Sequence, residues 1–252
     1  MNALFCGSNG EFSVKALELL AGKGIDVQYV LLSDAKACDK YEKLCRKINA
    51  KIIYTTSEED FSENQFDMLV SFTYQRKLKA YTINSGKFAI NFHPAPLPEY
   101  RGRGTNMFAI INGEKKWAVT CHYLDARIDT GKIIERREFN IEEAGIKTGK
   151  QLADYGWMIC LEILDELIDK IKNHEYIEGR VQSGVSTYYS MKDLQNAKQV
   201  ELSDGAEIIN RKINALWFPP YEGVYVKIEG KKFYLVNEEI MADVMEKLGS
   251  LE

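Results

Sequence analysis

The sequence lacks the excess of positive charge that marks most nucleic-acid-binding proteins. Its 33 lysines and arginines stand against 37 aspartates and glutamates, which gives a formal net charge of −4 at pH 7. Proteins that bind DNA or RNA usually cluster Lys and Arg against the phosphates. The acidic balance of the whole chain argues against a nucleic-acid partner, although it does not describe how the charge is distributed.

Cysteine and histidine are also scarce. The five cysteines are scattered, and no pair has the Cys-x-x-Cys spacing of a zinc ribbon or a disulfide scaffold. Cys6 and Cys121 lie within apolar runs, where a buried free thiol is the simplest interpretation. Only three histidines occur, His93, His122 and His174. No cluster of metal ligands appears in the sequence, so we expect no metal cofactor.

Long apolar runs are missing as well. No stretch approaches the roughly 18 residues of a membrane-spanning helix, and the N-terminus lacks the basic and apolar regions of a signal peptide. We therefore expect a cytoplasmic protein without membrane contact. The 252 residues, 45% of them hydrophobic and 28% charged, suffice for one large domain or a domain with a smaller appendage.

Strand and helix patterns alternate through the first part of the chain. Apolar runs predict strands, and a spacing of about 3.6 residues predicts helices, over residues 3–6, 12–20, 27–32, 38–49, 52–54, 66–72 and 88–92. This alternation favours an α/β fold with a Rossmann-like, mainly parallel sheet and helices on both faces. Ligands bind beyond the carboxyl ends of the strands in such sheets.

The later part of the chain continues this pattern and then changes it. Further helices and strands are predicted over 105–112, 117–124, 132–139, 148–172 and 205–216. Residues 224–236 read as a β-hairpin that turns at Gly230. We expect a catalytic core over residues 1–180 and a small C-terminal subdomain over 181–252, which serves substrate contact, dimerisation or both.

Residues 91–104, Asn-Phe-His-Pro-Ala-Pro-Leu-Pro-Glu-Tyr-Arg-Gly-Arg-Gly, follow the last strand of the first part. If residues 88–92 form a strand, Asn91 and His93 point to the same side, since side chains alternate along a strand. The prolines at 94, 96 and 98 make the following loop stiff and extended. An Asn-x-His pair alone is most often structural, so it needs support from elsewhere in the chain.

A second polar segment, Thr120-Cys-His-Tyr-Leu-Asp-Ala-Arg-Ile-Asp-Thr-Gly, contains Asp125 and Asp129 in a loop between two predicted strands. An Asx-turn at Asp129 is the alternative, purely structural interpretation. His122 lies in the strand before the loop, where a structural and a functional role are equally plausible. His174 lies among polar residues near a helix end and is expected to face solvent.

Together the two segments resemble the folate-dependent formyltransferase family. The matching elements occur in the family's order: Asn91-Phe-His93-Pro94, Leu97-Pro98 with Arg101-Gly102, Val119-Thr120-Cys-His122 and Ile128-Asp129-Thr130-Gly131. The resemblance covers roughly residues 1–180 well and the C-terminal part more loosely. It implies N10-formyltetrahydrofolate as co-substrate and Asn91, His93 and Asp129 as catalytic residues. It requires no metal.

The family's mechanism explains why these residue types are needed. An amine attacks the formyl carbon and creates a tetrahedral intermediate with an oxyanion, to which Asn91 can donate an amide N–H. His93 can donate a second hydrogen bond and transfer protons near neutral pH. Asp129 would orient His93 and accept the proton that the amine loses.

The resemblance also implies where folate and substrate bind. The pterin is expected near the strand over 66–72, the loop after it and the loop around Asp125. The implied folate contacts are Phe72, Tyr74, Arg76, Leu78 and Asp125, although Tyr74 and Leu78 could equally be packing residues. Ser8, Asn9 and Gly10, after the first strand, would approach the sugar or the diphosphate. Trp217 or Tyr221 could stack on a nucleotide base or could only pack the subdomain.

The family includes enzymes that act on glycinamide ribonucleotide, on methionyl-tRNA and on nucleotide-linked amino sugars. The length of the C-terminal part and the acidic charge favour the last branch, whose products serve surface polysaccharides. We therefore predict formyl transfer to the amine of a nucleotide-linked amino-deoxy sugar by a homodimer. The alternatives are a methionyl-tRNA formyltransferase and, in another class, a non-catalytic Rossmann-like nucleotide-binding module.

Overall fold

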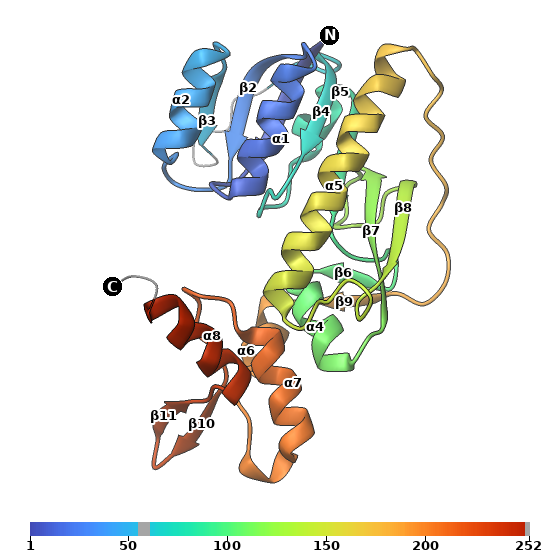
Figure 1. Ribbon diagram of the computed structural model, residues 1–252. Coiled ribbons are helices and arrows are strands. Elements are labelled where there is room, and N and C mark those ends of the chain that lie inside the picture. The colour runs from blue at the N-terminus through green and yellow to red at the C-terminus, as the bar shows by residue number, and fades with distance from the viewer. Residues whose placement is uncertain (55–60, 250–252) are drawn as a thin grey trace. The chain divides into compact units, whose positions relative to one another are not determined.

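The computed structural model describes residues 1–54 and 61–249, which divide into two compact units (Figure 1). Unit 1 comprises residues 1–99, 118–137 and 156–186, and unit 2 comprises residues 100–117, 138–155 and 187–252. The chain therefore passes between the units several times. The division into a catalytic core over residues 1–180 and a subdomain over 181–252 describes function, and it stays a prediction.

The predicted mainly parallel sheet is confirmed. Within the described ranges it has seven strands in the order β3-β2-β1-β4-β5-β7-β8. Their bounds are β1 (Asn2–Gly7), β2 (Asp26–Leu32), β3 (Lys51–Tyr54), β4 (Phe66–Ser71), β5 (Gly86–His93), β7 (Lys116–Tyr123) and β8 (Ile133–Asn140). The first five strands pair in parallel, and β7 runs antiparallel to β5.

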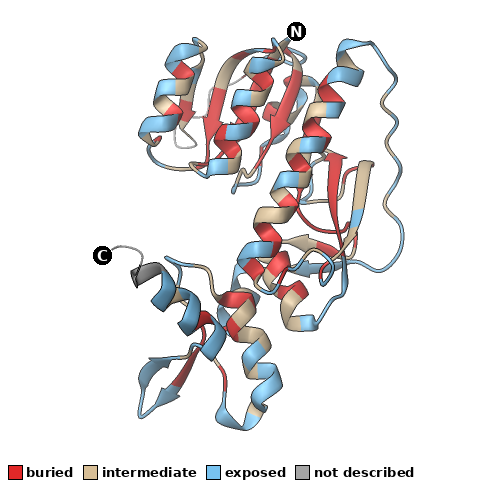
Figure 2. Cartoon of the chain, in the orientation of Figure 1, coloured by how far each residue is buried: buried red, intermediate tan, exposed pale blue. Residues whose placement is uncertain are grey.

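The central strands are buried because both of their faces are covered. Ala3, Leu4, Phe5 and Cys6 of β1 have no exposed surface, and β4 is buried almost throughout (Figure 2). Such strands show continuous apolar runs instead of an alternating pattern. The order of the strands reverses between β1 and β4, and ligands of open α/β sheets bind beside this kind of reversal, beyond the carboxyl ends of the strands.

Helices flank the sheet, as predicted. They are α1 (Glu11–Gly22), α2 (Asp39–Lys47), the short α3 (Ala80–Asn84) and α5 (Gly149–Lys172). α1 buries Val14, Leu17 and Leu20, whose spacing places them on one side of the helix. In unit 1, the ammonium group of Lys23 lies 2.9 Å from Asp165 and 2.7 Å from Asp169 of α5. These ion pairs join the end of α1 to α5.

Unit 2 has its own small core. It contains β6 (Tyr100–Gly102), α4 (Thr105–Asn112), β9 (Thr187–Tyr189), α6 (Met191–Ala197), the 3-10 helix η2 (Leu202–Asp204), α7 (Ala206–Leu216), β10 (Tyr225–Ile228), β11 (Lys231–Tyr234) and α8 (Glu238–Gly249). Buried side chains of α7, the segment before β10 and α8, among them Ile213, Leu216, Val224 and Ile240, pack together. The predicted hairpin is confirmed, with Tyr225 paired to Tyr234.

The sequence patterns missed the short elements. β6 and β9 form a parallel pair of three residues each, with Arg101 opposite Tyr188. Pairing between segments so far apart in the chain leaves no periodicity in a run of three residues. The short helices α3 and α6 were also not predicted, and neither was α8, which has 12 residues. None of the helices in the described ranges is long and apolar enough to cross a membrane.

Candidate active site

The carboxyl end of β5 brings polar side chains together with those of β7. Asn91 of β5 pairs with His122 of β7, and His93 pairs with Thr120. Side chains two residues apart share a face of the sheet, and directly paired residues lie on the same face of neighbouring strands. The register therefore places these four side chains on one face, as the alternation of Asn91 and His93 predicted for the first strand.

The third predicted catalytic residue lies beside them. The carboxylate of Asp129 has one oxygen 3.8 Å from Nδ1 of His93 and the other 3.7 Å from Nε2 of His122. The amide nitrogen of Asn91 lies 3.1 Å from that same Nε2 of His122. Asn91, His93 and Asp129 therefore gather in one place, together with His122, which the sequence had left open between a structural and a functional role.

The site is largely shielded from water. His122 is 1% exposed and His93 6%, and the side chain of Asp129 keeps 10% of its surface. Charge interactions are stronger in such an environment than in water. A carboxylate between two imidazoles, beside a carboxamide, can accept a proton and donate hydrogen bonds to a developing oxyanion. This is the chemistry of acyl transfer.

The loop that carries Asp129 is held by specific contacts. The Asp129 backbone adopts a left-handed conformation, with φ of +54°. Gln182 donates from its amide nitrogen to the backbone oxygens of Asp129 at 3.0 Å and Gly131 at 2.8 Å. A side chain at Gly131 would lie 1.7 Å from the backbone oxygen of Tyr123, so only glycine is accommodated there.

Asp125, a predicted folate contact, makes hydrogen bonds within this loop. Its carboxylate accepts hydrogen bonds from the Thr130 hydroxyl, at 2.6 and 2.7 Å to its two oxygens, and from the backbone N–H of Arg127 at 3.0 Å. These bonds form an Asx-type turn that shapes the loop. The sequence analysis gave an Asx-turn at Asp129 as the structural alternative, and the structure has such a turn at Asp125.

The proline-rich loop after His93 is tied to β7 and β8. The Thr120 hydroxyl donates to the backbone oxygen of Ala95 at 2.8 Å and accepts from the Leu97 N–H at 3.3 Å. Arg136 donates to the Leu97 oxygen at 3.0 Å and to the carboxylate of Glu99 at 2.9 Å. The loop is therefore anchored as well as stiff, which keeps His93 in place.

Two of the predicted folate contacts lie in the core of unit 1. Phe72 has no exposed surface, and its ring centroid lies 5.2 Å from that of Phe92 and 4.9 Å from that of Trp157. Leu78 is 7% exposed and belongs to a buried apolar cluster, against which Tyr74 packs with part of its ring exposed. Arg76 is exposed, and its Nε donates to the Ser33 oxygen at 3.3 Å. Folate contact by these residues stays a prediction.

The predicted substrate residues after β1 lie at the reversal of strand order. The hydroxyl of Ser8 is 2.7 Å from that of Thr73, which follows β4 and has φ of +60°. The carboxamide of Asn9 donates to the Lys36 oxygen at 2.7 Å and accepts from the Cys38 N–H at 2.9 Å. Gly10 precedes α1 as its N-cap. Asn9 thus supports the loop, and its contact with substrate stays a prediction.

The two aromatic residues predicted to meet the substrate belong to unit 2. Trp217 follows α7 and packs, half-buried, against the apolar core of that unit. Tyr221 is 68% exposed, and its ring centroid lies 5.9 Å from that of Phe218. The structure thus gives Trp217 packing contacts and leaves Tyr221 largely exposed, and substrate contact by either residue stays a prediction.

The cysteine beside this site is buried. Cys121 lies on β7 between Thr120 and His122, and its burial raises the pKa of its thiol. Burial also raises the pKa of Cys6 and Cys160. The thiolate is the nucleophilic form, so these buried thiols are inert near neutral pH. Across residues 1–54 and 61–249, no three His, Cys, Asp or Glu side chains are grouped so that they could hold a metal ion.

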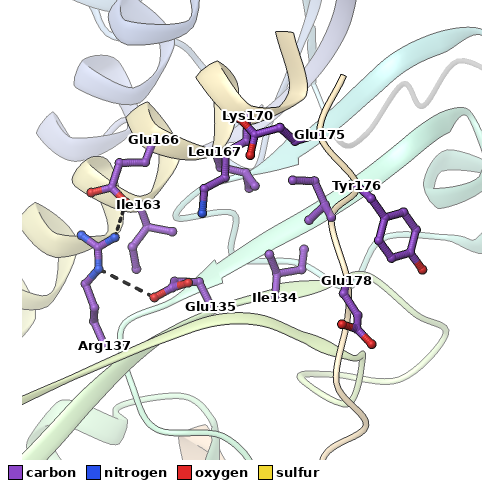
Figure 3. Close-up of a pocket in the computed structure, with 11 residues that line it drawn as sticks. Ile134, Glu135, Arg137, Ile163, Glu166, Leu167, Lys170, Glu175, Tyr176 and Glu178 are labelled. Carbon is purple, nitrogen blue, oxygen red and sulfur yellow. Dashed lines mark hydrogen bonds and ion pairs between the residues drawn. The ribbon is translucent and has the colours of Figure 1, made fainter. Parts of the chain in front are cut away.

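A surface cavity of unit 1 lies elsewhere. It lies between β8, α5 and residues 175–178, where Ile134, Ile163 and Leu167 provide apolar lining (Figure 3). Arg137 faces Glu166 and Glu135 at its edge. None of the predicted site residues lines it. The cavity is therefore separate from the cluster around Asn91.

Comparison with known proteins agrees with the geometry. Residues 25–154, just over half of the chain, match the formyl transferase family model. The chain thus belongs to the formyl transferase family, which confirms the resemblance found in the sequence.

Two curated relatives and one solved structure illustrate the likeness. The chain is 28% identical to GDP-perosamine N-formyltransferase of Brucella melitensis, over 97% of this chain and 95% of the relative. It is 26% identical to methionyl-tRNA formyltransferase of Wolbachia pipientis subsp. Culex pipiens, over 96% and 82%. A sugar 3N-formyl transferase, solved in the presence of dTDP and 5-N-formyl-THF, matches with a TM-score of 0.73 and 25% identity, over 94% and 87%.

Proposed function

We propose that this protein transfers the formyl group of N10-formyltetrahydrofolate to the amino group of a nucleotide-linked amino-deoxy sugar. The observation that carries the proposal is the gathering of Asn91, the buried His93 and Asp129 beside the carboxyl end of β5, in a chain of the formyl transferase family. A module that only binds nucleotides has no need of this combination.

The reaction balances with the groups at this site. The amine nitrogen of the sugar attacks the formyl carbon, a new C–N bond forms, and the bond from that carbon to N10 of the folate breaks. Asp129 accepts the proton that the amine loses, and N10 takes up a proton as it leaves. The products are the N-formyl sugar nucleotide and tetrahydrofolate.

Each side chain has a distinct part in this proposal. Asn91 donates an N–H to the oxygen of the tetrahedral intermediate, because that oxygen carries a negative charge at this stage. His93 donates to the same oxygen or to N10, and its Nδ1 lies 3.8 Å from Asp129. Asp129 orients His93 and takes the proton from the amine. The three residues are already together, so little rearrangement is needed before reaction.

The relatives support the class of both substrates. A sugar formyl transferase of the same fold, 25% identical, was solved with dTDP and 5-N-formyl-THF. GDP-perosamine N-formyltransferase matches along nearly its whole length. The methionyl-tRNA enzyme is matched over 82% of its length, and the net charge of −4 gives this chain no general attraction for tRNA. We therefore favour the nucleotide sugar over the tRNA.

The setting follows from the same proposal. We expect a homodimer in the cytoplasm that binds no nucleic acid and no membrane, with products used for surface polysaccharides. In unit 2 the hairpin leaves Phe233 and Tyr234 about half exposed. Exposure of apolar rings to water is unfavourable, and a second copy of the chain could cover them. Light scattering that gives the mass of a single copy would contradict the dimer.

The direct test is formyl transfer to a panel of acceptors. The purified chain is mixed with N10-formyltetrahydrofolate and GDP-perosamine and other nucleotide-linked 3-amino and 4-amino sugars, with methionyl-tRNA in parallel. We expect tetrahydrofolate release and a gain of one formyl mass on a sugar nucleotide. Formylation of the tRNA alone would keep the mechanism and overturn the substrate class. No transfer to any acceptor would overturn the proposal.

A further inference from the structure

His122 occupies a position in this site that the sequence did not assign. We infer that it is a positioning residue, which fixes the carboxamide of Asn91 so that an N–H of that amide faces the reacting formyl oxygen. This inference rests on the proposed function of the site. It starts from the contacts of the two nitrogens of the His122 ring.

The first contact determines which ring nitrogen of His122 carries the proton. Nδ1 lies 2.8 Å from the backbone oxygen of Tyr123, and a carbonyl oxygen can only accept a hydrogen bond. Nδ1 must therefore carry a hydrogen. In the neutral ring the other nitrogen, Nε2, then has no hydrogen and acts as an acceptor.

The second contact determines the orientation of the Asn91 carboxamide. Nε2 of His122 lies 3.1 Å from the amide nitrogen of Asn91, so Asn91 donates and His122 accepts. A carboxamide nitrogen carries two hydrogens. One is engaged by His122, and the second can be donated to the formyl oxygen. If the amide were rotated by half a turn, its oxygen would face the lone pair of Nε2, which is unfavourable.

The surroundings leave His122 little freedom. Its side chain is 2% exposed, and Nε2 lies 3.7 Å from the carboxylate of Asp129. The backbone N–H of Tyr123 donates to the Lys132 oxygen at 2.9 Å, while Gly131 closes on the Tyr123 carbonyl. The acceptor for His122 Nδ1 is thus itself held in place. Supporting partners of this kind orient the groups that touch the substrate.

A merely structural histidine would fill space without affecting the orientation of Asn91. The two roles differ in three measurable respects. A positioning role predicts a loss in kcat with little change in KM, dependence of that loss on Asn91, and a fixed tautomer of the ring. A structural role predicts a loss of stability that is independent of Asn91.

The kinetic test compares His122→Phe, which removes the acceptor at similar size, with His122→Gln, which keeps an acceptor and a donor. We expect His122→Phe to lower kcat on the order of 10–10², below the full contribution of an oxyanion donor. KM for N10-formyltetrahydrofolate should change little, and His122→Gln should recover most of kcat. His174→Asn, at an exposed position with φ of +59°, is the matched control and should match wild type.

The decisive step is a double-mutant cycle with Asn91→Ala. If His122 acts through Asn91, adding His122→Phe to Asn91→Ala should lower kcat little further. An equal loss with and without Asn91 would show a structural role and overturn the inference. Thermal unfolding of each variant separates a folding defect from a loss of orientation.

Nitrogen NMR of the histidine rings tests the arrangement without any substrate. With only three histidines, the spectrum is simple to assign using the His122→Gln and His174→Asn variants. We expect His122 to carry its proton on Nδ1, and a proton on Nε2 would overturn the inference. If wild type formylates no acceptor, the proposed function fails, whereas the NMR result still decides how His122 is arranged.

Discussion

The two units differ in how completely their strands are buried. In unit 1, β1 and β4 are covered on both faces, and Phe66, at the start of β4, has no exposed surface. In unit 2, all four residues of β11 are exposed, and Phe233 keeps 48% of its surface. Figure 2 shows this contrast between the buried central strands of unit 1 and the exposed strand β11. Unit 1 therefore has the rigid core that a catalytic cluster needs.

The two units also differ in their exposed apolar side chains and in their cysteines. Most of the large apolar side chains that stay exposed belong to unit 2, including Tyr221, Ile228 and Met245. All five cysteines belong to unit 1, and four of them are buried. Unit 2 therefore exposes more of the large apolar side chains than unit 1, although both units contain a buried core.

The largest effect is expected from truncating equivalent rings in the two units. Phe66→Ala should lower the free energy of unfolding by about 3–5 kcal/mol, because it leaves a cavity in a closed core. Phe233→Ala should change it by about 0.5 kcal/mol or less. Urea unfolding measures both. A loss for Phe233→Ala that grows with protein concentration would place the proposed dimer interface at the hairpin.

Asn91→Ala tests the catalytic assignment within the rigid unit. Removing one oxyanion donor should lower kcat on the order of 10²–10³, with the unfolding temperature close to that of wild type. Asn173→Ala, an exposed asparagine after α5, provides the control and should keep full activity. Near-normal turnover by Asn91→Ala would show that the chemistry lies elsewhere.

Gly131→Ala tests how closely the catalytic loop is packed. The added methyl group would lie 1.7 Å from the Tyr123 oxygen, so the loop must shift, and we expect a loss of about 1–3 kcal/mol in unfolding free energy. Activity should fall as well, because Asp129 is two residues away. Gly22→Ala, where nothing lies within 4 Å, should be neutral or slightly stabilising. Equal behaviour of the two variants would contradict the close packing of the loop.

Thiol labelling reports on unit 1, because all five cysteines belong to that unit. We expect the smallest effect here, namely slow labelling of the buried thiols. Burial raises the pKa of the Cys45 thiol to about 11 and raises the pKa of Cys6 and Cys121 further, so these groups stay protonated at pH 8. A neutral thiol reacts slowly, and we expect the half-buried Cys38 to label first. Mass spectrometry counts the labels. Fast labelling of Cys121 in folded protein would disprove the closed core of unit 1.

Most of the long elements could be predicted because each leaves a local signal, whereas the catalytic assignment of Asn91, His93 and Asp129 came from the resemblance to the family. The apolar runs of β1 and β4 and the helical spacing of α5 needed no tertiary information. Asn91 and His93 share a face by simple alternation along β5. The folate contacts could not be predicted in this way, since Phe72 and Leu78 look the same in sequence whether they line a ligand site or fill the core.

Other features depended on contacts between distant segments. The pairing of β6 with β9 joins residues 100–102 to residues 187–189 and leaves no pattern in either. His122 became part of the site only through the register of β5 and β7, which sets Asn91 opposite it. A shift of one residue in that register would have turned His122 to the other face.

The α/β class and the family could therefore be predicted from the chain alone, because periodicity and motif order are properties of the sequence. The catalytic roles of Asn91, His93 and Asp129 are implied by the family resemblance and stay a prediction. Only the folded chain shows how those residues meet: Asp129 lies between two imidazoles, the amide nitrogen of Asn91 lies 3.1 Å from a ring nitrogen of His122, and the chain divides into two units. The physical reason is that distances and hydrogen-bond partners arise from strand register and loop geometry, which no single segment encodes.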